Sequence, residues 1–154
     1  MSAFTFGPRS LLHLEGINED LEDVAHHAII LSTVDFAVIE GLRTAGRQAQ
    51  LVAEGASQTL QSKHIIGHAI DIAAMVGGAI SWDYPLYPVI AQAFQQASRD
   101  LSIPLRWGGV WDVDLADLSD NLALEVENYK ARKHGKAFID AGHFELHFPT
   151  GTTA

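Results

Sequence analysis

The chain has 154 residues, close to the usual size of one domain, so we expect a single hydrophobic core. Its composition, with 47% hydrophobic and 19% charged residues, excludes a largely disordered or fibrous chain. A net charge of −9 repels phosphate groups, so we expect neither nucleic-acid binding nor attachment to anionic membranes.

Two features that the sequence lacks narrow the chemistry further. The chain has no cysteine, which excludes disulfides, thiolate nucleophiles and cysteine-ligated metals, so any metal must be held by His, Asp or Glu. The N-terminal residues show no basic region followed by an apolar run, and no apolar stretch is long enough to span a membrane. We therefore expect a protein without a signal peptide or a membrane anchor.

Hydrophobic periodicity predicts helices and strands that alternate along the chain. Asn18 is a predicted N-cap, and Leu21, Val24, Ala28 and Leu31 recur at helical spacing after it. The later predicted elements, in chain order, are a strand at 34–39, a helix at 47–54, a strand at 69–75, a helix capped by Ser81 or Asp83 and ending near Leu101, a strand at 104–107, a helix at 122–133 and a strand at 143–148. Without regular βαβ spacing, this order predicts an α+β domain in which helices flank a small, mainly antiparallel sheet.

Two segments combine histidines with carboxylates in a pattern that suits a metal site. His64 and Asp71 lie on either side of a predicted turn, and His143 begins the last predicted strand, three residues after Asp140. Two imidazoles and one carboxylate suit zinc and leave a fourth position for water, while a carboxylate outside the ligand set can transfer a proton. His64, Asp71 and His143 are therefore candidate ligands, and Asp140 is the candidate acid and base. The spacing alone leaves open the alternative that these histidines are surface or core-edge residues satisfied by hydrogen bonds.

Four motifs follow one another along the chain. They are Glu-Gly-x-Arg-Thr from Glu40, Ser-x-His-x-x-Gly-x-Ala-x-Asp from Ser62, Trp-Gly-Gly-x-Trp from Trp107, and Asp-x-x-His-Phe-Glu from Asp140. In this order they resemble the D-alanyl-D-alanine carboxypeptidase-like zinc peptidases, and most closely the phage L-alanyl-D-glutamate endopeptidases, endolysins that cut peptidoglycan stem peptides. The resemblance covers about residues 38–148 of a single predicted domain, 1–154, with zinc at its sheet.

The resemblance assigns a role to each matching position. It implies that His64, Asp71 and His143 are the zinc ligands and that Asp140 is the general acid and base. It also implies that Arg43 holds the substrate and polarises the scissile carbonyl. The other positions that line the family's site fall on Gln48 and Ser62.

Several positions depart from the family pattern or stay open. Val110 replaces an acidic residue, and Ala141-Gly142 replaces a proline-containing pair, but neither change removes a ligand. Glu145 could orient a ligand imidazole or lie on a solvated strand face, and we expect His147 behind the ligands or at the substrate rim. The acidic loop 112–120 could bind calcium, although it lacks the glycine and closing glutamate of an EF-hand, which favours a solvated loop.

The resemblance implies a zinc-dependent endolysin that cleaves the L-Ala–D-Glu bond of the peptidoglycan stem peptide. We expect a monomer that accumulates in the host cytoplasm before lysis and then acts on the cell wall. One alternative is a D-Ala-D-Ala dipeptidase or carboxypeptidase that uses the same site. Another is a zinc-binding module without catalysis, against which the presence of both Asp140 and Arg43 argues.

Overall fold

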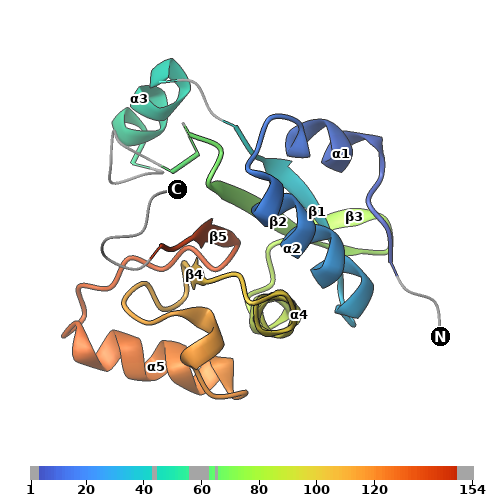
Figure 1. Ribbon diagram of the computed structural model, residues 1–154. Helices are drawn as coiled ribbons and strands as arrows, with labels where there is room; N and C mark the ends of the chain where they lie inside the picture. The colour runs from blue at the N-terminus through green and yellow to red at the C-terminus, as the bar shows by residue number, and fades with distance from the viewer. Residues whose placement is uncertain (1–3, 43–44, 56–62, 65, 149–154) are drawn as a thin grey trace.

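The computed structural model describes residues 4–42, 45–55, 63–64 and 66–148 (Figure 1). Within them the strands form one five-stranded antiparallel sheet in the order β1-β2-β5-β4, with β3 paired to β2. The strands are β1 (Asp35–Glu40), β2 (Ala69–Val76), β3 (Ala79–Ser81), β4 (Leu105–Trp107) and β5 (His143–Leu146). The long central strand β2 thereby joins the N-terminal and C-terminal parts of the sheet.

Helices pack on this sheet and along its edge. They are α1 (Pro8–Leu14), α2 (Glu19–Leu31), α3 (Ala45–Ala53), α4 (Leu86–Leu101) and α5 (Leu122–Arg132), with a short 3-10 helix at Leu115–Asp117. In Figure 1, α4 lies between α2 and α5. Helix α1 packs against β1, where the Ser10 hydroxyl accepts a hydrogen bond from the Val38 N–H at 3.0 Å. No helix within the described residues is long and apolar enough to cross a membrane.

The alternation of side chains along the strands separates the core from the candidate site. Ile70, Ile72 and Phe144 are fully or almost fully buried and belong to the main hydrophobic core. Because successive side chains point to opposite faces of a sheet, Asp71 and His143 lie on the other face. The sheet therefore carries the core on one face and the predicted metal ligands on the other.

The α+β prediction with a mainly antiparallel sheet is confirmed. The helix after Asn18 is α2, and the Asn18 side chain accepts a hydrogen bond from the Asp20 N–H at 2.9 Å, as expected of an N-cap. The other predicted helices and strands occur with boundaries shifted by a few residues. The last strand, predicted to reach Phe148, ends at Leu146, since the next N–H bonds to the Pro104 carbonyl outside the ladder.

Sequence periodicity missed or misplaced a few features. Helix α1 and strand β3 were not predicted, because they have only seven and three residues and are too short to show a period. The predicted cap of α4 by Ser81 or Asp83 is wrong. The helix begins at Leu86 after Pro85 without a side-chain cap, and the Ser81 hydroxyl instead accepts a hydrogen bond from the Asp83 N–H.

Candidate metal centre

The three predicted ligands meet at the junction of β2 and β5. Asp71 of β2 lies directly opposite His143 of β5 in the antiparallel register, and His64 belongs to the segment before β2. One ligand atom from each residue lies within 4.8 Å of the other two. Among the described residues this is the group of His, Asp and Glu side chains that could hold a metal ion.

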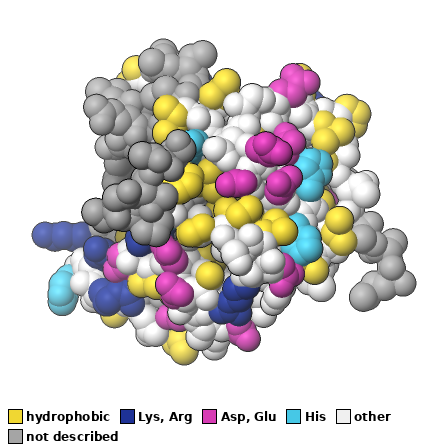
Figure 2. Space-filling model, viewed as in Figure 1, with side chains coloured by type: hydrophobic (Ala, Val, Ile, Leu, Met, Phe, Trp, Pro, Cys, Tyr) yellow, Lys and Arg dark blue, Asp and Glu magenta, His cyan; other side chains and the backbone are white. Residues whose placement is uncertain are grey.

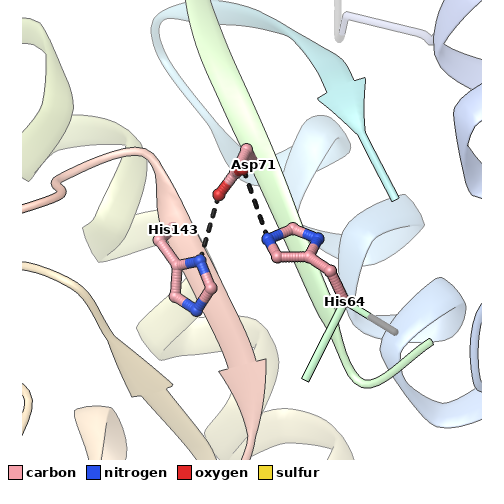
Figure 3. A group of neighbouring side chains, drawn as sticks. All are labelled: His64, Asp71 and His143. Carbon is pink, nitrogen blue, oxygen red and sulfur yellow. Dashed lines mark hydrogen bonds and ion pairs between the residues drawn. The ribbon is translucent and has the colours of Figure 1, made fainter. Parts of the chain in front are cut away.

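The Asp71 carboxylate lies between the two imidazoles (Figure 3). Its Oδ2 is 3.3 Å from His64 Nε2, and its Oδ1 is 3.0 Å from His143 Nδ1. The two rings stand edge to face with their centroids 5.1 Å apart. Both histidines are buried, whereas the Asp71 side chain is 20% exposed. These distances place His64 Nε2, His143 Nδ1 and a carboxylate oxygen as the converging ligand atoms.

A glycine of the first motif fixes the orientation of His64. The Gly41 carbonyl accepts a hydrogen bond from His64 Nδ1 at 2.8 Å, and because a carbonyl can only accept, the proton lies on Nδ1. Nε2 therefore faces Asp71, and in the neutral ring it is the nitrogen whose lone pair is available to a metal. A Cβ on Gly41 would lie 2.0 Å from the His13 carbonyl oxygen, so only glycine allows this close approach of β1 to α1.

The other imidazole is held through side chains. His143 Nε2 is 2.8 Å from Glu145 Oε1. Glu145 Oε2 is in turn 3.0 Å from Lys63 Nζ, which also donates to the Leu146 carbonyl at 2.6 Å. Of the two interpretations left open for Glu145, the structure supports contact with a ligand imidazole. Lys63 was missed from the sequence, although it stands beside His64 in the second motif.

The charges in this cluster favour a cation between the three ligands. Burial raises the pKa of the Asp71 carboxyl, but hydrogen bonds from His143 and His64 outweigh burial and hold that pKa well below its usual range. Burial lowers the pKa of His143, yet its hydrogen bonds to Asp71 and Glu145 outweigh burial and raise it to about 9. The site thus stabilises positive charge between its donor atoms. Two imidazoles and a carboxylate are also a ligand set that zinc accepts.

Asp140 occupies a turn that hydrogen bonds hold against β5. Its N–H donates to the Gly108 carbonyl at 2.9 Å, and its carbonyl accepts from the His143 N–H at 3.0 Å. A Cβ on Gly108 would lie 2.0 Å from the Asp140 carbonyl oxygen, which explains the glycine there. The turn places Asp140 three residues ahead of a ligand and directly bonded to its backbone.

Both tryptophans of the third motif donate hydrogen bonds to the backbone around Asp140. The indole N–H of Trp107 donates to the Ala141 carbonyl at 2.8 Å, and that of Trp111 donates to the Phe138 carbonyl at 2.7 Å. The Trp111 ring also lies 4.9 Å from the His143 ring, centroid to centroid. Trp107 is fully buried, as expected for a core residue. The motif therefore supports the segment that carries Asp140.

The two departures from the family pattern have structural explanations. Val110 is fully buried and packs in the core, which suits an apolar side chain at this position. The Gly142 carbonyl accepts a hydrogen bond from the Ile72 N–H at 2.8 Å, and a Cβ on Gly142 would lie 2.5 Å from the Ile72 carbonyl oxygen. The Ala141-Gly142 pair thus lets this turn pack closely against β2.

In the acidic loop 112–120, which is fully described, three carboxylates each pair with a different arginine. Asp112 pairs with Arg132 at 2.8 Å, Asp114 with Arg106 at 2.5 Å, and Asp120 with Arg99 at 3.2 Å. Figure 2 shows Lys and Arg side chains beside acidic ones in the lower part of the molecule, where α5 lies. These carboxylates do not converge, so the loop geometry does not support the calcium alternative.

The remaining predicted residues fall in different places. His147 Nδ1 lies 2.7 Å from Asp114 Oδ1, which directs its ring to the acidic loop and away from the three ligands. Arg43 and Ser62 lie outside the described residues. Gln48 lies in α3, where the described part of the chain does not include its side chain. The roles of Arg43, Gln48 and Ser62 remain predictions.

Comparison with known proteins places this site in a family. A family model for phage L-alanyl-D-glutamate peptidase matches residues 1–147. The chain belongs to this family. The recognition made from the four motifs is confirmed, and the chain is a peptidase by descent.

Individual relatives agree with the family model. The chain is 36% identical over 148 residues to an L-alanyl-D-glutamate peptidase of Escherichia phage T5, covering 94% of this chain and 98% of that protein. It is 28% identical over 125 residues to an L-alanyl-D-glutamate peptidase of Listeria phage A118, covering 79% of this chain and 42% of that protein. The crystal structure of Serratia marcescens L-Ala D-Glu endopeptidase ChiX matches with a TM-score of 0.73 at 36% identity, covering 94% of this chain and 91% of that one.

Proposed function

We propose that this protein is a zinc-dependent peptidoglycan hydrolase that cleaves the L-Ala–D-Glu bond of the stem peptide. The observation that carries the proposal is the convergence of His64, Asp71 and His143 within 4.8 Å in a chain of this peptidase family. The activity named for its phage relatives and for ChiX favours this bond over the D-Ala–D-Ala bond.

The proposed chemistry combines a metal with the residues around it. Zinc, when bound, would supply Lewis acidity and lower the pKa of water at the site towards about 7. His64 presents Nε2 because its Nδ1 proton is held by the Gly41 carbonyl. The Asp71 carboxylate contributes the negative charge of the ligand set, and its lowered pKa keeps it ionised at neutral pH.

Asp140 is the proposed proton carrier. A carboxylate beside the ligands can accept a proton from the attacking water and return it to the leaving amine. The turn at Asp140 is bonded to Gly108 and to the His143 backbone, which supports a fixed position for the residue. Arg43 is the proposed donor to the scissile carbonyl, where a guanidinium stabilises developing negative charge.

The substrate and setting follow from the same proposal. The substrate is the stem peptide of peptidoglycan, and the protein acts on the cell wall. We further propose that it works as a monomer and accumulates in the host cytoplasm before lysis.

Mass spectrometry of digested muropeptides tests the proposed bond. Cleavage should expose a new N-terminal D-Glu and leave L-Ala on the muramyl side. The His64→Ala protein serves as the control for contaminating hydrolases and should release neither product. Release of free D-Ala or of a D-Ala-D-Ala dipeptide would contradict the proposed bond and favour the carboxypeptidase alternative.

A further inference from the structure

Two charged side chains lie behind His143, on the side away from Asp71. Glu145 Oε1 is 2.8 Å from His143 Nε2, and Glu145 Oε2 is 3.0 Å from Lys63 Nζ. We propose that Glu145 and Lys63 form a positioning pair that selects the ring orientation and tautomer in which His143 offers Nδ1 to the metal. This inference rests on the proposed function, because it concerns the same metal.

Glu145 determines which nitrogen of His143 carries the proton. A neutral imidazole has one N–H, and His143 has a carboxylate oxygen at each ring nitrogen, at 3.0 Å for Asp71 and 2.8 Å for Glu145. When a metal displaces the Nδ1 proton, the remaining Nε2–H donates to Glu145, and the lone pair of Nδ1 faces Asp71 and the metal position. Without Glu145, Nδ1–H would donate to Asp71 and close that position.

Lys63 holds Glu145 in place for this role. Its Nζ contacts Glu145 Oε2 and also donates to the Leu146 carbonyl on β5, so the ammonium bridges the side chain and the backbone of the strand. Lys63 directly precedes one ligand, and Glu145 follows the other by two residues. The pair thereby ties the segment that carries His64 to the strand that carries His143.

Within the described residues, the partner that orients the other imidazole is of a different kind. His64 is oriented by a backbone carbonyl, which no side-chain substitution removes. His143 is oriented by a carboxylate, and partners of this kind behind a metal ligand typically contribute 10–100-fold to metal affinity. The two imidazoles should therefore differ in their sensitivity to substitutions behind them.

Zinc affinity, measured by competition with a chelator, tests the pair. Glu145→Ala should weaken zinc binding by about 10–100-fold. Lys63→Met should weaken it by about two- to fivefold, as for a partly exposed ion pair, and Lys63→Arg should restore it. Because Lys63 acts through Glu145, Lys63→Met should have no further effect in the Glu145→Ala background.

A second ion pair in the protein supplies matched controls. Glu127 and Lys130 on α5 lie 3.1 Å apart and are exposed. Glu127→Ala and Lys130→Met make the same charge changes away from the site and should leave zinc affinity unchanged. Thermal unfolding of the metal-free proteins checks that each variant is folded. Glu145→Gln, which keeps an acceptor of the same size, should lie between the wild type and Glu145→Ala.

Nitrogen-15 NMR of the zinc-loaded wild type tests the tautomer without any substitution. The His143 ring should show a metal-bound Nδ1 and a hydrogen-bonded Nε2–H. Zinc on Nε2, or unchanged zinc affinity in a folded Glu145→Ala protein that still hydrolyses peptidoglycan, would overturn the pair alone. A wild-type protein that hydrolyses the substrate without binding zinc would overturn the proposed function together with the pair.

Discussion

The two imidazoles of the metal centre are held in different ways. His64 is oriented by the Gly41 carbonyl, and that carbonyl is placed by a glycine that packs against the His13 backbone. His143 is oriented by the Glu145 carboxylate and packs beside the Trp111 ring. Within the described residues, His64 is thus oriented through a backbone contact and His143 through side chains. The first should be sensitive to added bulk, and the second to lost charge.

The largest expected effect comes from removing His64, the ligand that the Gly41 carbonyl orients. His64→Ala deletes one of three ligands, so zinc occupancy should fall from about one per chain to near zero and hydrolysis should be lost. Elemental analysis of the purified protein measures occupancy, and chelation of the wild type should abolish hydrolysis in the same way. The control is His134→Ala, which removes an exposed histidine just after α5. A His64→Ala protein with full zinc occupancy would contradict the ligand assignment.

The next largest effect separates catalysis from metal binding. Asp140→Asn keeps the shape of the side chain and removes its negative charge, so zinc should stay bound while turnover falls by about 10²–10⁴-fold. Steady-state hydrolysis and zinc content of the same preparation measure both effects. Near-normal hydrolysis would move the proton-transfer role elsewhere, whereas loss of zinc would make Asp140 a ligand.

The sequence allowed the candidate ligands to be predicted, but not most of the contacts that hold them in place. The residue types and the order of the four motifs predicted His64, Asp71 and His143, and the antiparallel register of β2 and β5 places Asp71 opposite His143. The contacts of Gly41 with α1 join residues far apart in the sequence, and no local pattern reports them. Lys63 has a role only because β5 lies beside its segment.

In the metal-free protein, His143 and its side-chain partners should make the free energy of unfolding depend on pH. The folded state raises the pKa of His143 from 6.5 to about 9. This contribution is therefore complete below pH 6.5 and is lost as the pH rises through 9. The shift corresponds to about 3 kcal/mol of unfolding free energy, measurable by urea titration at several pH values.

Two comparisons isolate His143 as the cause. Bound zinc takes the place of the proton between His143 and Asp71. The zinc-loaded protein should therefore not lose stability over the same pH range. A His143→Gln protein without metal should show a flatter pH profile than the wild type. Equal stability of metal-free wild type at pH 6 and pH 9.5 would argue against a charged His143 in this site.

A smaller effect is expected from a larger side chain at Gly41, whose carbonyl orients His64. Gly41→Ala places a methyl group against the His13 carbonyl, and overpacking of this kind costs about 1–3 kcal/mol. It should also weaken zinc binding, since the Gly41 carbonyl moves with the backbone. Gly7→Ala is the matched control, because a Cβ there meets no atom within 4 Å. Equal unfolding free energies and zinc affinities in the two variants would show that the close approach at Gly41 is unimportant.

Anomalous diffraction at the zinc edge from crystals of the zinc-loaded protein tests the central claim most directly. The account predicts one zinc ion bound by His64 Nε2, His143 Nδ1 and an Asp71 oxygen, at about 2.0–2.2 Å from each. Asp140 should lie outside the ligand set, and Glu145 should remain hydrogen-bonded to His143 Nε2. Zinc bound through His143 Nε2, or at a position that excludes any of the three ligands, would contradict the account.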